Sequence, residues 1–290
     1  MNVLAPPPTR NGTHGGDLIP FPVHDTNLLL QHLSGSSIKD YLGCSLRYYF
    51  RKVEGREEAP SLNLILGHAV HAALQAHYLT RWREQASDEA LVINAFHEAY
   101  SAEVGDGIPG ETAESIADKQ ELGERMVRAY LQSDHCLNAP TPVAVEVALR
   151  ERLHGMPTDM VGQVDLVLPS ADGGLIPVDF KTIANQPNTE LEGFLHETQT
   201  VLYQLLVEGS TGGRVDGREI VFITKHKQPR VIVHRIPRAG AESIARFRAM
   251  ATAAYDGILN RRWSPQPGMA CAWCSFRDAC AGWTGKAGGS

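Results

Sequence analysis

The sequence predicts an α/β protein in which a central mixed β-sheet is flanked by helices. Two observations carry this prediction: apolar residues recur at helical spacing up to about residue 135, and strand-like alternation begins near residue 143. The 290 residues are 43% hydrophobic and 21% charged, which is typical of a globular protein and excludes disordered or low-complexity classes. A chain of this length can bury a core as one large domain or two small ones.

The two ends of the chain differ in composition from the middle. Residues 1–33 are rich in Pro, Gly and Asn, so we expect a flexible arm, and residues 285–290 resemble a similar tail. Residues 34–284 are then expected to form a single domain. The start of the chain lacks the layout of a signal peptide, and no apolar run is long enough to span a bilayer. We therefore expect a cytoplasmic protein that makes no membrane contact.

The N-terminal half of the domain is predicted to be helical. The first helix should begin near Ser36 or Ser37, because either serine can cap it. A second helix should follow Pro60, where apolar side chains form a stripe at helical spacing. The next segment, at about residues 86–135, is expected to be a helical insertion. Its two amphipathic helices are expected over residues 88–103 and 111–135.

The C-terminal half is predicted to contain the sheet. Residues 143–153 alternate as a strand, and a turn cluster of Pro, Ser, Asp and Gly between two further strands predicts a hairpin. The expected elements after the first strand are strands over 161–168 and 175–182, a helix over 191–208, strands over 219–224 and 231–236, and a helix over 241–260.

The hairpin carries an acidic cluster. Strand side chains alternate between faces, so the apolar even-numbered residues suit a core, while Asp165, Asp179 and Lys181 share the other face. Two carboxylates opposite each other can hold a hard divalent cation, and a neighbouring lysine can assist water attack on a phosphodiester. Taken alone, Asp-x-Lys is more often a surface pair on an exposed strand. Its position one hairpin after Gly162-Gln163-Val164-Asp165 favours the functional interpretation.

Four motifs occur in a fixed order along the chain. They are Gly67-x-x-x-His71, Gly162-Gln163-Val164-Asp165, Asp179-Phe180-Lys181 and Gln199-x-x-x-Tyr203, preceded by an opening helix that contains Cys44. This arrangement resembles the PD-(D/E)XK nuclease superfamily, and specifically its RecB-like exonuclease branch, from about Leu33 to Cys280. Ser45 is a departure, because many members have proline after the cysteine. The resemblance implies a restriction-endonuclease-like core.

The resemblance also implies roles for the motif residues. His71, Asp165, Asp179 and the backbone carbonyl of Phe180 would bind Mg²⁺ or Mn²⁺, and a histidine ligand makes Mn²⁺ a credible choice. Lys181 would position and activate the attacking water. A lone histidine on a helix is more often a surface or core residue than a ligand, and the motif spacing is what favours His71.

Gln199 and Tyr203 lie four residues apart, hence on one helical face. A buried polar pair is the simpler interpretation, whereas the resemblance implies that both line the active site or contact the DNA strand. His68 lies three residues before His71 and has no assigned role.

Three of the five cysteines are close together near the C-terminus. Cys271, Cys274 and Cys280 form a C-x2-C-x5-C pattern, which in a reducing compartment indicates a metal rather than a disulfide. Three thiolates leave a tetrahedral site incomplete, so Cys44 or Cys136 must supply the fourth ligand.

The resemblance to iron–sulfur members of the branch, including the CRISPR-associated exonucleases and AddB-type subunits, selects Cys44 and implies a [4Fe–4S] cluster over residues 271–280 and Cys44. Zinc is the competing occupant. Cys136 is then expected to be a buried thiol that packs as a small hydrophobe.

The net charge of −6 conceals an uneven distribution. Residues 214–262 contain eleven basic and four acidic residues, a net charge of +7, which leaves −13 on the remainder. Such a run is usually a solvated face, but it follows the catalytic motifs. Lys225, Lys227 and Arg230 are therefore our candidates for contacts with a DNA backbone.

These inferences favour a metal-dependent DNA exonuclease that hydrolyses phosphodiester bonds on single-stranded DNA ends. They leave open whether it acts in DNA repair and recombination, CRISPR adaptation or phage DNA metabolism. No G-x-x-x-x-G-K-[ST] motif occurs, so any helicase would be a partner protein, as would any CRISPR or recombination factor. One alternative is a non-catalytic DNA-binding or assembly module with a structural metal cluster. Another is a zinc-dependent interaction protein whose Asp-x-Lys is incidental.

Overall fold

The computed structural model describes residues 26–58 and 60–285. Contacts divide the chain into two compact units. Among the described residues, the first contains 60–149 and 163–240, and the second contains 26–58, 150–162 and 241–285. Most of the expected N-terminal arm and of the C-terminal tail lies outside the described residues. No helix of the described part is long and apolar enough to cross a membrane.

The first unit contains the mixed sheet that the sequence predicts. In it β3 pairs antiparallel with β4, β4 runs parallel to β5, β5 runs antiparallel to β6, and β2 also pairs with β3. The strands are β2 (Ala144–Glu151), β3 (Asp159–Pro169), β4 (Leu175–Ile183), β5 (Gly217–Thr224) and β6 (Val231–Pro237). The helices are α4 (Leu62–Trp82), α5 (Glu89–Val104), α6 (Ala113–Leu131), α7 (Asp134–Leu137), α8 (Thr189–Leu195) and α9 (Glu197–Thr211).

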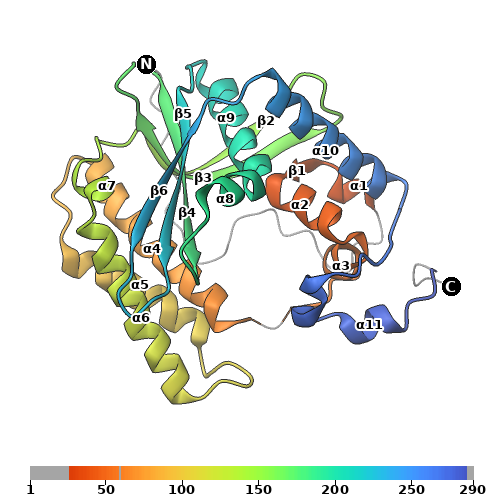
Figure 1. The fold of residues 1–290 in the computed structure, drawn as a ribbon, viewed down its shortest axis with the longest axis horizontal. Helices are drawn as coiled ribbons and strands as arrows, with labels where there is room; N and C mark the ends of the chain where they lie inside the picture. Colours follow the sequence, from red (N-terminus) through yellow and green to blue (C-terminus); the bar gives the residue numbers. More distant parts are fainter. Residues whose placement is uncertain (1–25, 59, 286–290) are drawn as a thin grey trace. The chain divides into compact units, whose positions relative to one another are not determined.

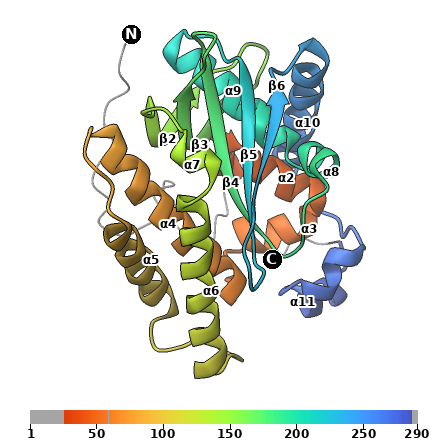
Figure 2. The ribbon, with the colours of Figure 1, turned by 60° about the vertical axis from the view of Figure 1, so that its left-hand side comes forward.

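Helices cover both faces of strands β3–β6 (Figures 1 and 2). On one face, Leu166, Phe180 and Val221 belong to the core that α4, α5 and α6 complete. On the other face lies α9, which contacts β4 and β5. Period-two alternation therefore holds as predicted, but the face that carries Asp179 is covered by a helix rather than exposed.

The helical insertion packs closely because one of its residues has no side chain. A Cβ atom added to Gly123 in α6 would lie 2.1 Å from the Phe96 ring of α5 and 2.7 Å from Leu66 of α4. Both predicted helices are present, although the second ends at Leu131. A separate turn, α7, follows it, with Ser133 as its N-cap.

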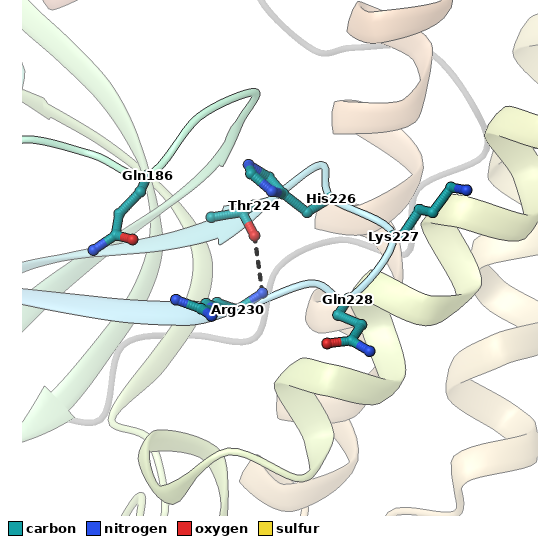
Figure 3. A pocket seen from close by; sticks show the side chains of 6 residues that line it. All are labelled: Gln186, Thr224, His226, Lys227, Gln228 and Arg230. Carbon is teal, nitrogen blue, oxygen red and sulfur yellow. Dashed lines mark hydrogen bonds between the residues drawn. The ribbon is translucent and has the colours of Figure 1, made fainter.

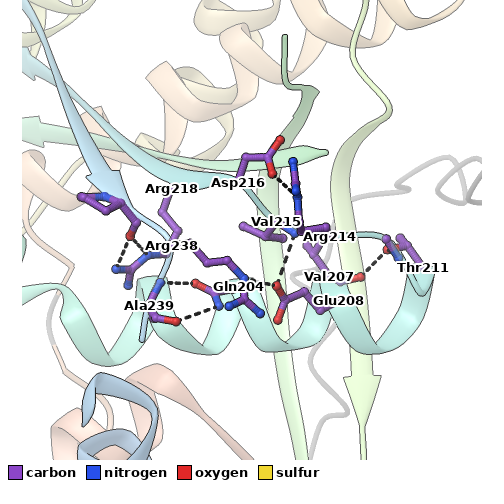
Figure 4. A network of polar contacts seen from close by, with 12 residues as sticks. Gln204, Val207, Glu208, Thr211, Arg214, Val215, Asp216, Arg218, Arg238 and Ala239 are labelled. Atoms are coloured by element: carbon purple, nitrogen blue, oxygen red, sulfur yellow. Dashed lines mark hydrogen bonds and ion pairs between the residues drawn. The ribbon is translucent and has the colours of Figure 1, made fainter. Parts of the chain in front are cut away.

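A polar network fixes α9 against the far end of the sheet (Figure 4). Gln204 is fully buried, and its side chain accepts a hydrogen bond from Ala239 N at 2.7 Å and donates one back to Ala239 O. Glu208, one turn later, pairs with Arg238 at 2.9 Å. Because buried polar groups must be satisfied, these contacts define the position of α9 along the sheet.

In the second unit, β1 (His32–Ser34) pairs in parallel with the start of β3. Its helical segments are α1 (Thr26–Leu29), α2 (Gly35–Gly43), α3 (Ser45–Tyr48), η1 (Tyr49–Val53), α10 (Ala241–Leu259), η2 (Met269–Trp273) and α11 (Arg277–Ala281). The helix expected to start near Ser36 or Ser37 starts earlier, because Ser34 is its cap and accepts a hydrogen bond from Ser37 N. Leu33 is fully buried, so the ordered chain begins before residue 34.

Segments from the two ends of the sequence pack together in this second unit. The Tyr41 hydroxyl donates a 2.8 Å hydrogen bond to Arg262 O. Trp263 contacts the rings of Tyr41, Tyr48 and Tyr49, all with centroid distances near 6 Å or less. Aromatic clusters of this kind bury a large apolar area, so they anchor α2 and α3 to the chain that follows α10.

Candidate active site

The acidic cluster lies where strands β3 and β4 separate. The ladder of Cα partners ends at Leu166–Val178, one residue before Asp165 and Asp179. Beyond that point the Phe180 N–H donates instead to the Asp165 carboxylate, at 2.8 Å. The two carboxylates therefore lie near each other at the site where the sheet opens, as the alternation predicts.

Asp179 is the centre of a buried polar chain. Its side chain is only 2% exposed, and its Oδ2 lies 2.8 Å from the Lys181 ammonium. On the other side, Gln199 of α9 donates to Asp179 Oδ1 at 3.0 Å and reaches the Tyr203 hydroxyl at 2.8 Å. The surface-pair interpretation of Asp-x-Lys is thus wrong, because Asp179 is buried and bonded to Gln199 of α9.

His71 approaches the same site from helix α4. Its Nδ1 lies 3.6 Å from Asp165 Oδ2. Its ring meets Phe180 edge-on, and Phe180 in turn packs against Tyr78 and Tyr130. This aromatic packing fixes the helix face that carries the histidine.

Glu146 in β2 is a site residue that the sequence motifs did not reveal. Its carboxylate, the His71 imidazole and the Asp165 carboxylate offer ligand atoms that all lie within 4.8 Å of one another. Gln163 donates a hydrogen bond to Glu146 Oε2. The structure therefore brings His71 and Asp165 together as predicted, with Glu146 as the third member of the group rather than Asp179.

The backbone of Glu146 is strained. Its φ is +49°, a left-handed value that a residue with a Cβ rarely adopts inside a strand. Such conformations cost about 1–3 kcal/mol and persist mainly where function requires them. Nothing in the sequence marks the position, because glutamate, unlike glycine, gives no signal of a positive φ. The one clue in the sequence is an acidic residue between two valines, Val145 and Val147.

Burial and charge shift the pKa values of the site in different directions. Burial raises the pKa of Asp179, and the nearby Asp165 raises it further, while Lys181 opposes the shift. Burial alone would lower the pKa of Lys181, but Asp179 and Asp165 outweigh it and raise that pKa. The two carboxylates therefore stabilise the protonated form of the lysine.

The donor set fits a hard divalent cation. Two carboxylates and one imidazole suit Mg²⁺ or Mn²⁺. Asp179 Oδ2 is also buried without a well-aligned hydrogen bond, despite its close contact with Lys181, and so it has unused acceptor capacity. The role of the Phe180 carbonyl oxygen as a metal ligand stays a prediction, because no contact of that oxygen tests it.

The comparisons with known proteins agree with this geometry. Residues 32–281 match the sequence profile of the PD-(D/E)XK nuclease superfamily. The chain belongs to this superfamily. The match spans both compact units and includes every motif residue of the site.

One of two similar solved structures shares the fold at low sequence identity. One, from Eubacterium rectale and provisionally described as an exonuclease, is 15% identical, with a TM-score of 0.60, and the match covers 95% of this chain and 97% of that one. A second, the protein SSO0001, is 19% identical over 89% of this chain and 97% of that one, but its TM-score of 0.36 is too low to support an argument. The first likeness supports the restriction-endonuclease-like mixed α/β core. No curated protein matches the chain.

Four of the cysteines in this nuclease-superfamily chain belong to the second unit. Burial raises the pKa of the Cys280 thiol, and Cys44, Cys271 and Cys274 each raise it further, so the four thiols are close enough to interact electrostatically. No three described sulfur atoms lie within 4.8 Å of one another.

Hydrogen bonds hold the residues that follow Cys44 against the C-terminal segment. Ser45, the next residue, accepts from Ser264 N at 2.9 Å, and Leu46 N donates to Ser264 O at 3.1 Å. Cys136 lies apart in the first unit, where it is 4% exposed and 3.3 Å from His77 Nε2, so it is buried as expected.

The predicted DNA contacts lie at the hairpin between β5 and β6. Lys227 and Arg230 line a cavity of about 350 Å³ together with Gln186, Thr224, His226 and Gln228 (Figure 3). A second cavity, of about 610 Å³, lies between this hairpin and α6, and both Lys225 and Lys227 line it. The three predicted residues are thus gathered at one end of the sheet.

Proposed function

We propose that this chain is a metal-dependent DNA exonuclease that hydrolyses phosphodiester bonds at the ends of single-stranded DNA. The observation that carries the proposal is the Lys181 ammonium, 2.8 Å from buried Asp179 and next to the group formed by His71, Glu146 and Asp165. A lysine beside a divalent-cation site is the arrangement expected for activating water against a phosphate.

The residues that would hold the cation are His71, Glu146, Asp165 and Asp179, with the Phe180 carbonyl as a further ligand. When bound, the cation would supply Lewis-acid stabilisation of the charge that develops on the phosphate oxygens. An imidazole among oxygen ligands makes Mn²⁺ at least as suitable as Mg²⁺.

Lys181 would orient the attacking water and hold or accept its proton at Nζ. Asp179 and Asp165 raise the pKa of Lys181, and this influence would weaken if the same carboxylates held a cation, which would bring the amine closer to the pKa of a working base. The Gln199 amide donates hydrogen bonds to Asp179 Oδ1 and to the Tyr203 hydroxyl. Both α9 residues would therefore fix the orientation of the Asp179 carboxylate.

We further propose that Cys44, Cys271, Cys274 and Cys280 bind a [4Fe–4S] cluster with a structural role. Support comes from the C-x2-C-x5-C spacing of the last three cysteines and from the effect of Cys44, Cys271 and Cys274 on the pKa of Cys280, which means that they lie near it. Such a cluster would link two distant parts of the chain, which reduces the entropy of the unfolded state. Anaerobic preparation should give a brown protein with iron and sulfide in equal amounts, whereas a colourless zinc-loaded protein would refute this assignment.

A non-catalytic DNA-binding module is the second candidate function. The complete set of metal-ligating residues and the lysine argue against it, because a binding module has no need of a strained Glu146 or a buried Asp179. Cytoplasmic location and a helicase or recombination partner remain part of the leading proposal.

The proposal is tested with Lys181→Ala protein. We expect metal-dependent release of nucleotides from end-labelled single strands by the wild type, and at least a hundredfold slower release by the variant at an unchanged melting temperature. Lys39→Ala, an exposed lysine on α2, is the matched control and should retain full activity. Equal activity in folded Lys181→Ala protein would refute the proposed mechanism.

A further inference from the structure

Two lysines from different elements converge on a single residue at the start of α4. Lys119 Nζ of α6 donates to the Asn63 side-chain oxygen at 3.1 Å, and Lys225 Nζ donates to the Asn63 backbone oxygen at 3.3 Å. Asn63 is the second residue of a 21-residue helix, whose N-terminal end carries a partial positive charge. The two ammonium groups and the positive end of the α4 dipole therefore lie close together.

This convergence is electrostatically unfavourable without an anion. The pKa of Lys225 is lowered, first by burial and then by the charge of Lys119. Within the described part of the chain, no carboxylate lies within ion-pair distance of either ammonium. Asp118 and Glu121 of α6 also line the neighbouring cavity, and Glu121 pairs with Arg125. Two adjacent ammonium groups that share the neutral acceptor Asn63 and have no direct ion pair favour a negative ligand.

The space beside the lysines can admit such a ligand. The cavity of about 610 Å³ between α6 and the β5–β6 hairpin is lined by four basic residues, Lys119, Arg125, Lys225 and Lys227, and by two acidic ones, Asp118 and Glu121. It adjoins the hairpin that carries Arg230, and both cavities share His226 and Lys227 (Figure 3). Basic side chains thus continue from one cavity into the next.

The lysine pair lies close to the candidate active site. Lys225 N donates to Ile183 O at 2.7 Å, and Ile183 is two residues beyond Lys181 in β4. Asn63 lies eight residues before His71 on α4, which at 1.5 Å per residue is about 12 Å along the helix. That distance corresponds to roughly four nucleotides at the 3.4 Å rise of a DNA strand.

We propose that Lys119 and Lys225, held together by Asn63, bind a phosphate group of the nucleic-acid strand a few nucleotides from the scissile bond. The inference rests on the proposed function, because it takes the substrate strand to be the anion. It assigns a substrate contact to Lys119 in the helical insertion and gives Lys225 a defined partner. The phosphate is either an internal phosphodiester or the terminal phosphate of the strand, since both present the same anionic oxygens.

The test measures binding of fluorescent single-stranded oligonucleotides by wild type, Lys119→Ala, Lys225→Ala and the double variant, with Ca²⁺ in place of an activating metal. Loss of one phosphate contact should weaken binding about three- to tenfold and reduce the slope of log K against log salt by about 0.7. Lys39→Ala is the control that removes one positive charge outside the site. Oligonucleotides with a 5′-phosphate, a 3′-phosphate or hydroxyl ends separate the two sources of phosphate.

A loss that is equal for all ends supports an internal phosphate, and a loss confined to one phosphorylated end supports a terminal phosphate. Wild-type affinity and salt slope in both single variants would overturn the phosphate site while leaving the proposed nuclease intact, provided the wild type cleaves DNA. Absence of binding and cleavage by the wild type would overturn both proposals. Lys119→Ala changes a half-exposed helix residue, so its folding, checked by circular dichroism, is not expected to be affected.

Discussion

Replacing Glu146 with glutamine removes one negative charge from the group that includes His71 and Asp165, while it keeps the size of the side chain. The ligand atoms of the three residues lie within 4.8 Å of one another, so the Glu146 carboxylate would contribute directly to cation binding. Glutamine keeps the strained φ of +49°, and the backbone cost is therefore the same in both proteins.

The size of the effect follows from the charges. Two unit charges 4 Å apart interact by about 4 kcal/mol at an effective dielectric constant of 20, and desolvation cancels a large part of this. We therefore expect Glu146→Gln to weaken Mn²⁺ binding by about 1.4–2.8 kcal/mol, a factor of ten to a hundred. The metal-free variant should be at least as stable as the wild type, because the substitution removes the repulsion between the carboxylates of Glu146 and Asp165.

Isothermal titration of metal-free protein with Mn²⁺ measures the change directly. Glu89→Gln, which makes the same chemical change on the exposed first turn of α5, should bind Mn²⁺ with wild-type affinity. If Glu146→Gln protein binds Mn²⁺ as tightly as wild type while remaining folded, Glu146 is not part of the metal site.

Three further predictions concern stability and reactivity. Burial lowers the pKa of His77 from 6.5 to about 4, so the unfolded chain takes up the proton first on acidification. The free energy of unfolding, measured in urea, should fall by up to about 3 kcal/mol between pH 6.5 and 4, and less so in His77→Gln protein. Gly257→Ala should cost about 1–3 kcal/mol, because a Cβ there lies 1.9 Å from the Tyr41 hydroxyl, whereas Gly240→Ala meets no atom within 4 Å and should be neutral in thermal melts. Burial raises the pKa of Cys136 to about 11, so iodoacetamide at pH 8 should label it only in urea; rapid native labelling would contradict its burial.

The hairpin and its acidic cluster were predictable because both follow from local rules. Period-two alternation places Asp165, Asp179 and Lys181 on one face, and the turn cluster between the strands sets their register. The observed ladder, which ends one residue before the two aspartates, agrees with that prediction.

Features that depend on distant parts of the chain were not predictable in this way. The burial of Asp179 comes from α9, whose position depends on Gln204 and the backbone of Ala239. The helix cap at Ser34 follows from the pairing of β1 with β3, which the composition of the first 33 residues did not indicate. The role of Glu146 depends on a backbone conformation that only tertiary packing can impose.

The central claim is that the site around Lys181 hydrolyses DNA from its ends. It is tested most directly by incubating anaerobically purified protein with linear and circular forms of the same single strand, each with Mn²⁺, Mg²⁺ or a chelator. We predict nucleotide release from the linear strand with either metal, no release with the chelator, and an intact circle. Cleavage of the circle would contradict the requirement for an end, and a linear strand left intact in the presence of both metals would contradict the assignment of a nuclease.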